Sequence, residues 1–142
     1  MTQQQSAMRF AGGVLAATGI LFALAALPAL HPAAHVFLQV AYWPLHDVPP
    51  ELAVPTPLLL GISGGLTVGL GAMQWALGTY VASISADSAA KVARCTAWTW
   101  FVTDSTASVL VGAPMNVVLN LSFLALILLS CKPRPEARLV SA

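Results

Sequence analysis

One carboxylic acid stands inside a stretch that is otherwise apolar enough to lie in lipid. Asp104 occurs in TWFVTDSTASVLVG, with Ser105 beside it and Ser108 one helical turn later. Two amides, Asn116 and Asn120, follow four residues apart and therefore share one face of a helix. A carboxyl group in this company can accept hydrogen bonds from the amides and hydroxyls, or donate one when protonated. The pattern predicts an intramembrane polar cluster and leaves open whether Asp104 is ionised.

Two interpretations of this cluster compete. An ionisable side chain in the membrane costs about 2.5–3.5 kcal/mol and usually faces a bundle interior or a water-filled cavity. Asp104, Asn116 and Asn120 can form an interhelical clamp, but such hydrogen bonds average only about 0.6 kcal/mol each. Because a clamp alone hardly offsets the cost of insertion, we expect Asp104 to be the polar floor of a small pocket. The clamp stays open as the structural alternative.

The other candidates for chemistry are histidines in a proline-rich segment. His31 and His35 stand at i, i+4, and WPLHD places His46 beside Asp47. Three such histidines can ligate zinc or copper. Proline-rich outer loops also carry solvated histidines, so we predict no metal site and keep His46 and Asp47 as polar neighbours of the Asp104 pocket. A catalytic pairing of His46 with Asp104 is conceivable, but nothing in the sequence shows that they meet.

Composition places these residues in a membrane. The chain has 142 residues, of which 8% are charged and 58% hydrophobic, and its mean hydropathy is +0.80. Soluble domains carry roughly a quarter charged residues. A helix needs about 20 mostly apolar residues to cross a bilayer. The sequence predicts a single all-α domain over 1–142, a bundle of four transmembrane helices at 8–30, 57–83, 89–111 and 114–131.

Basic residues near span ends predict the orientation. Lys and Arg favour the cytoplasmic side of a membrane, and the segment 31–56 contains neither. In a four-span arrangement all six basic residues fall on one side: Arg9, Lys91, Arg94, Lys132, Arg134 and Arg138. We therefore expect both termini, including the tail 132–142, to be cytoplasmic in a bacterial inner membrane.

The segment 31–56 is predicted to cap the outer mouth of the bundle. Residues 32–43 can form a short helix with His35, Gln39 and Tyr42 on one face, and Tyr42 suits the membrane interface. Five prolines between 44 and 57 exclude regular helix from the stretch that follows.

Glycines in the second span predict close helix packing. Small residues let helix backbones approach each other in lipid, where van der Waals contact drives association. Two glycine series share this span, with spacings of four and of seven residues: Gly61, Gly65 and Gly69, and Gly64, Gly71 and Gly78. The second span should therefore lie at the centre of the bundle, although the glycines can also make room for a flat ligand.

A tight outer turn at Gly112, Ala113 and Pro114 predicts that spans three and four form an antiparallel hairpin. Asp104 precedes Gly112 by eight residues and Asn120 follows it by eight. Each therefore lies about 12 Å along its helix from the turn. We expect the two side chains at the same depth.

Taken with the basic second loop, the segments GGLTVGLGAMQWALG and GAPMNVVLN resemble the small four-helix bacterial membrane proteins called DoxX-like, over residues 58–131. The family name comes from a subunit of a quinone-linked oxidoreductase, so the resemblance implies a role in a membrane complex or as a redox partner. The histidine- and proline-rich cap and Asp104 depart from that pattern. No functional residue is carried over.

These patterns favour a non-enzymatic accessory subunit that packs against other membrane subunits or against itself. The chain contains no phosphate-binding glycine loop, activated serine motif or zinc-protease helix, and we expect no nucleic-acid partner. The alternative is a binder or small enzyme for a lipid, quinone or sterol-like molecule, anchored by Asp104 and Asn120. Transport of protons or small solutes through Asp104 is a third hypothesis.

Overall fold

The computed structural model describes residues 1–49 and 52–132, and these form helices without any strand, which confirms the all-α prediction for this part of the chain. The elements are α1 (Gln3–Leu24), the short 3-10 helix η1 (Pro28–Leu30), α2 (His31–Tyr42), α3 (Pro55–Ala76), the π-helical turn η2 (Leu77–Val81), α4 (Ala86–Leu110) and α5 (Pro114–Ser130). Two helical segments are long and apolar enough to cross a membrane, Gln3–Leu24 and Pro55–Val81, and α5 is a shorter apolar helix.

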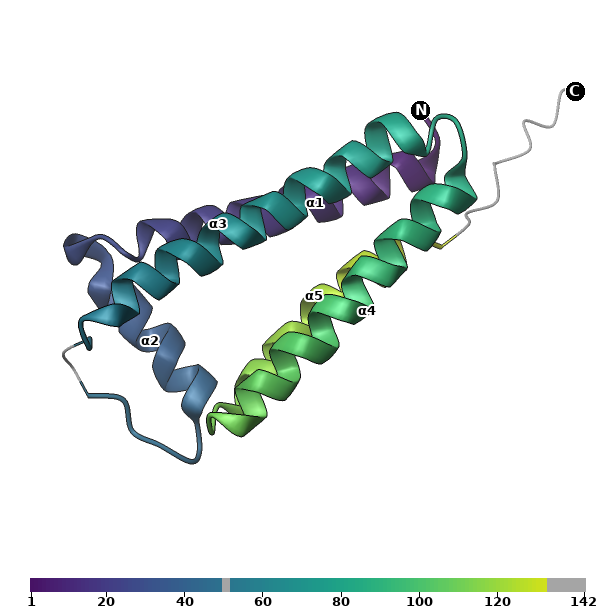
Figure 1. Ribbon diagram of the computed structural model, residues 1–142. Helices are drawn as coiled ribbons and strands as arrows, with labels where there is room; N and C mark the ends of the chain where they lie inside the picture. The colour runs from purple at the N-terminus through teal and green to yellow at the C-terminus, as the bar shows by residue number, and fades with distance from the viewer. Residues whose placement is uncertain (50–51, 133–142) are drawn as a thin grey trace, which may run out of the picture.

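The helices form two antiparallel pairs. Helix α1 packs along α3, and α4 packs along α5. The pairs meet at the end that carries the N-terminus and diverge toward the other end, where α2 runs between them (Figure 1). We call the end where the pairs meet the convergent end. The divergence leaves a wedge between the pairs, and α2 covers its wide side.

Backbone contact at glycines holds α1 against α3. A Cβ atom on Gly71 would lie only 2.6 Å from the carbonyl oxygen of Gly12. Two helical turns along the pair, a Cβ on Gly64 would lie 2.7 Å from the carbonyl oxygen of Gly19. Because real Cβ atoms essentially never come this close to backbone, only glycine permits this approach of the two helices.

The two glycine series of the second span have different surroundings. Gly78 continues the series of Gly64 and Gly71, since a Cβ there would lie 2.8 Å from the Cβ of Met8. By contrast, no described atom lies within 4 Å of a Cβ built on Gly65 or Gly69. Gly61 is intermediate, with the Ala26 side chain 3.9 Å away. Only one series therefore packs within the chain, and the other faces outward.

The convergent end holds the main apolar core and joins the two pairs. Buried small and aliphatic side chains of α1, η2, α4 and α5 pack there, among them Met8, Ala93 and Ile127. The buried Gln74 amide donates to the Ser130 hydroxyl at 3.0 Å, which links α3 to α5. The described basic residues also lie toward this end: Arg9 in α1, Lys91 and Arg94 in α4, and Lys132 after α5.

Helix α2 and the loop after it close the wide end. The side chains of His35 and Gln39 both donate to the carbonyl oxygen of Val48, at 2.9 and 3.0 Å, so the loop folds back along α2. The His46 ring lies against the α4–α5 turn, where a Cβ on Gly112 would be 2.7 Å from His46 Cε1. Gly112 also has a φ of +76°, a backbone conformation that favours glycine.

The first span differs from the predicted range 8–30 at both ends. Helix α1 begins at Gln3 because Thr2 and Gln5 form a capping box, in which each side chain bonds the backbone of the other. It ends at Leu24, ahead of Pro28, which lacks the N–H needed to continue a helix. The segment 25–30 thus belongs to the connection to α2.

The second span begins earlier than the predicted residue 57. Pro55 and Pro57 lie in the first turn of α3, where backbone N–H groups have no intrahelical partner. The helix therefore starts two residues before Pro57, at Pro55, which we expected to lie in the irregular stretch. The third and fourth helices differ from their predicted ranges by no more than three residues at either end.

Neighbouring glycines of α3 offer a matched test of this packing. Gly64→Ala should lower the free energy of unfolding by about 1–3 kcal/mol, because the new methyl group meets the α1 backbone. Gly65→Ala should be neutral or slightly stabilising, since its methyl group meets no described atom and alanine favours helix. Thermal unfolding of both variants in mild detergent measures the difference. Equal melting temperatures would contradict the α1–α3 packing.

Candidate functional site

The wedge between the helix pairs contains a cavity of about 420 Å³, which we call the wedge cavity. Its walls come from α1, α2 and α3 on one side and from α4 and α5 on the other. The residues that line it are Leu15, Phe22, Phe37, Leu38, Ala41, Tyr42, Leu60, Ser63, Thr67, Leu70, Trp100, Asp104, Ser108, Val111, Ala113, Asn116, Leu119, Asn120, Ser122 and Phe123. Most of these side chains are apolar, so the polar atoms in the lining stand out.

The polar cluster predicted from the sequence is assembled on the α4–α5 wall. Asp104 Oδ2 accepts hydrogen bonds from the side-chain amides of Asn116, at 3.2 Å, and of Asn120. The Asn116 amide also donates to Ser108 Oγ at 2.9 Å, and the Asn120 amide to Ser105 Oγ at 3.4 Å. The hairpin thus brings Asp104 and Asn120 to the same level. We call these five residues the Asp104 cluster.

One oxygen of Asp104 has no partner in the cluster. Within residues 1–49 and 52–132, no group donates to Oδ1, and this atom is not among the buried atoms without a partner, so it is accessible. Asp104 itself lines the wedge cavity. The amide oxygens of Asn116 and Asn120 likewise accept no hydrogen bond from the described chain. The donors of Ser108, Asn116 and Asn120 are therefore all used, whereas acceptor atoms of the cluster are left open.

Aromatic side chains form much of the remaining wall. Phe22 of α1 and Phe37 of α2 pack with ring centroids 4.8 Å apart. On the opposite side Trp100 and Phe123 lie edge to face at 6.4 Å. Trp100 precedes Asp104 by one helical turn, so both side chains project from the same face of α4. The cavity combines one polar region with apolar and aromatic walls, which is the usual build of a small-molecule site.

His46 and Asp47, which we expected beside the Asp104 pocket, are not in the described lining of the wedge cavity. Both line a neighbouring cavity of about 520 Å³ under the loop after α2, which we call the cap cavity. Asp104 is absent from its described lining. The two cavities share walls at Phe37, Tyr42 and Ser63, so they are adjacent spaces with different polar groups.

The three histidines do not come together. His31 Nε2 faces the Ala26 carbonyl oxygen at 3.4 Å, and His35 is bonded to Val48. His46 packs edge-on against Tyr42 with centroids 6.1 Å apart. In the described part of the chain, no group of three or more His, Cys, Asp or Glu side chains has the geometry to hold a metal ion.

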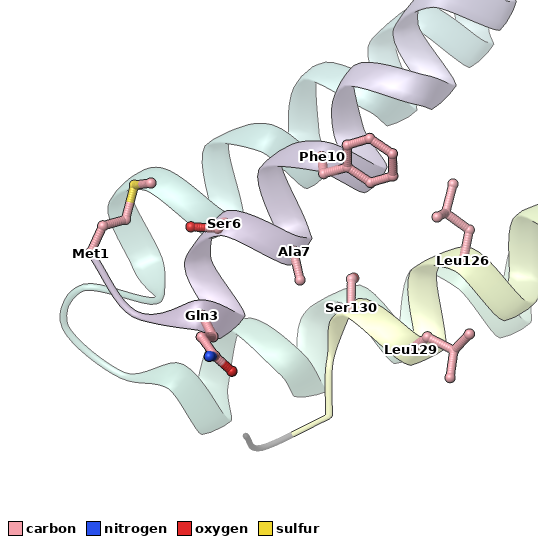
Figure 2. Close-up of a pocket in the computed structure, with 8 residues that line it drawn as sticks. All are labelled: Met1, Gln3, Ser6, Ala7, Phe10, Leu126, Leu129 and Ser130. Carbon is pink, nitrogen blue, oxygen red and sulfur yellow. The ribbon is translucent and has the colours of Figure 1, made fainter. Parts of the chain in front are cut away.

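A third cavity, of about 590 Å³, lies at the convergent end between the first turns of α1 and the last turns of α5 (Figure 2). Its described lining, which includes Phe10, Leu126 and Leu129, contains no charged side chain. Its Ser130 hydroxyl is already bonded to the Ile127 carbonyl and to Gln74. The Gln3 amide also lines this cavity, but its described lining has no counterpart of the acid that lines the wedge cavity.

Sequence reasoning missed the aromatic walls. The spacing of Trp100 and Asp104 was an available signal, because residues four apart share a helix face. Phe22, Phe37 and Phe123 come from three different helices, and only the tertiary arrangement unites them.

Compared with protein-family models, curated proteins and solved structures, the chain matches none of them. The resemblance to DoxX-like proteins stays a prediction.

The two interpretations of the cluster predict different effects of Asp104→Asn on stability. If the cluster serves a pocket, the melting temperature should stay the same or rise, because the substitution removes an ionisable group that is costly in the membrane. Thermal unfolding in mild detergent, with Gly64→Ala as the destabilised reference, measures this. A loss as large as that of the reference would identify the cluster as a structural clamp.

Proposed function

We propose that the protein binds a lipophilic small molecule in the wedge cavity, with the ligand's polar group at Asp104. The observation that carries this proposal is the accessible Oδ1 atom of Asp104, which has no partner in the described chain, on an acid that lines a mostly apolar cavity. A volume of about 420 Å³ falls within the range of small-molecule sites, about 300–1,000 Å³. A purely structural clamp has no need of a cavity beside it.

The setting of this function is a four-span protein of the bacterial inner membrane with both termini in the cytoplasm. The collection of Arg9, Lys91, Arg94 and Lys132 toward the convergent end supports it, because basic residues favour the cytoplasmic side. Arg134 and Arg138 lie outside the described residues. In this orientation the cap and the wide side of the wedge face outward, so the ligand lies in the outer half of the bilayer.

A second role, as a subunit that packs with other membrane proteins or with itself, is supported by the outward face of α3. Gly65 and Gly69 meet no described atom, and Leu58, Ile62 and Leu66 beside them are exposed. Small residues on a helix surface allow another helix to approach closely in lipid. This role is compatible with ligand binding, because the wedge cavity lies on the opposite side of the α3 backbone from these glycines' open face.

The orientation can be tested with one cysteine on each side of the membrane. In a Cys95→Ala background, Val54→Cys should react with a membrane-impermeant maleimide in intact spheroplasts. Ile84→Cys should react only after permeabilisation. Both positions are strongly exposed, at 94% and 89%, so a difference in labelling reports the side and not burial. Labelling of both positions in intact spheroplasts would contradict the four-span topology.

Filling the wedge cavity should abolish ligand binding. Ser63→Phe adds a ring to the cavity wall, whereas Ile62→Phe adds one to the adjacent outward position and serves as the matched control. With the neutral probe 1-N-phenylnaphthylamine and protein in nanodiscs, we expect Ser63→Phe to weaken saturable binding by about tenfold or more, equivalent to about 1.4 kcal/mol. Ile62→Phe should bind as the wild type does. Equal binding by both variants would remove the wedge cavity as the site.

A further inference from the structure

The open atoms of the Asp104 cluster define what the ligand must offer. Both amide NH2 groups are already directed at Asp104 Oδ2 and the serine hydroxyls. Among the cluster residues that line the cavity, the atoms left for a ligand are acceptors, namely Asp104 Oδ1 and the two amide oxygens. Since acceptors bind donors, the matching head group carries N–H or O–H. A quinone carbonyl, which only accepts, finds no free donor among the cluster residues that line the cavity, because the Ser108 hydroxyl donates to the Asp104 backbone carbonyl.

The charged side chains of the lining help to decide whether the ligand's N–H or O–H donor is neutral, anionic or cationic. Asp104 is the only side chain with a formal charge in the described lining, which contains no Lys, Arg or His. An anionic head group would therefore meet a like charge and no counter-ion. A cation would compensate a carboxylate held in a low-dielectric site, where an unpaired charge is costly.

The aromatic walls favour a cation as well. A cation near an aromatic face is attracted by the ring quadrupole, most strongly by tryptophan. Trp100 and Asp104 project from one face of α4, and Phe123 packs against Trp100. A cationic group bonded to Asp104 Oδ1 would thus lie on the same wall of the cavity as Trp100 and Phe123.

We propose that the ligand of the wedge cavity is a lipophilic amine that binds as an ammonium cation, donating hydrogen bonds to Asp104 and the amide oxygens of Asn116 and Asn120. This inference rests on the proposed function and names its ligand class. The apolar part of the amine fills the space between Phe22, Phe37 and Leu60. No bond is made or broken in this binding.

Three probes with one hydrophobic body test the head group directly: 4-hexylbenzylamine, 4-hexylbenzyl alcohol and 4-hexylbenzoate. Each is titrated calorimetrically into the full chain in phosphatidylcholine nanodiscs, whose net charge is zero, with empty nanodiscs as the blank. The amine should bind about tenfold more tightly than the alcohol, a ratio equivalent to about 1.4 kcal/mol, and the benzoate should bind most weakly. This ranking is measured on the wild-type protein, so it holds even where a variant fails to fold.

The variant Asp104→Asn tests whether the preference for the amine over the alcohol depends on the Asp104 carboxyl group. It should weaken amine binding to the level of the alcohol and leave alcohol binding nearly unchanged. Asp47→Asn is the matched control, because Asp47 is an exposed acid that lines the cap cavity, and it should leave both affinities as in the wild type.

The outcomes separate this inference from the proposed function. If the alcohol or the benzoate binds as tightly as the amine, or Asp104→Asn has no effect on the amine, the ligand is not an amine and the wedge cavity still stands as a binding site. If none of the probes binds, or Ser63→Phe leaves their binding unchanged, the proposed function itself fails.

Discussion

The architecture depends on backbone contact between α1 and α3. Gly12 and Gly19 face Gly71 and Gly64 at distances that no other residue permits, so the two helices lie together along their length. Packing of this kind supplies the attraction between helices in lipid, where exclusion of water does not. This pair is the more closely packed of the two, because its glycines allow the backbones to approach each other, and the second pair packs against it.

The second pair attaches mainly at one end. The Gln74–Ser130 hydrogen bond and the buried core around Ala93 join the pairs near the cytoplasmic end of the proposed topology. Toward the other end the pairs separate, with α2 between them (Figure 1), and the wedge cavity of about 420 Å³ lies in this region. The wedge cavity is thus a direct consequence of two well-packed helix pairs being joined asymmetrically. The Asp104 cluster lies on the α4–α5 wall of the wedge cavity.

The depth of the cluster could be predicted from the sequence, but its neighbours could not. Counting residues from the turn at Gly112 places Asp104 and Asn120 level, because both helices rise equally from one point. Periodicity revealed two glycine series in α3 and could not select the one that packs, since that depends on the partner helix. Similarly, the adjacency of His46 and Asp47 in the sequence did not indicate which of two neighbouring cavities they line. The capping box of Thr2 and Gln5, which determines the start of α1, is a signal present in the sequence, but the predicted range 8–30 did not use it.

The contact between His46 and Gly112 ties the cap to the hairpin turn. The imidazole ring occupies the space that a side chain at Gly112 would need, so the loop after α2 and the α4–α5 turn are in close contact there. A swing of the hairpin away from α1 and α3 would have to carry this loop with it or break the contact. Any change in the width of the cavity is therefore coupled mechanically to the outer surface of the protein.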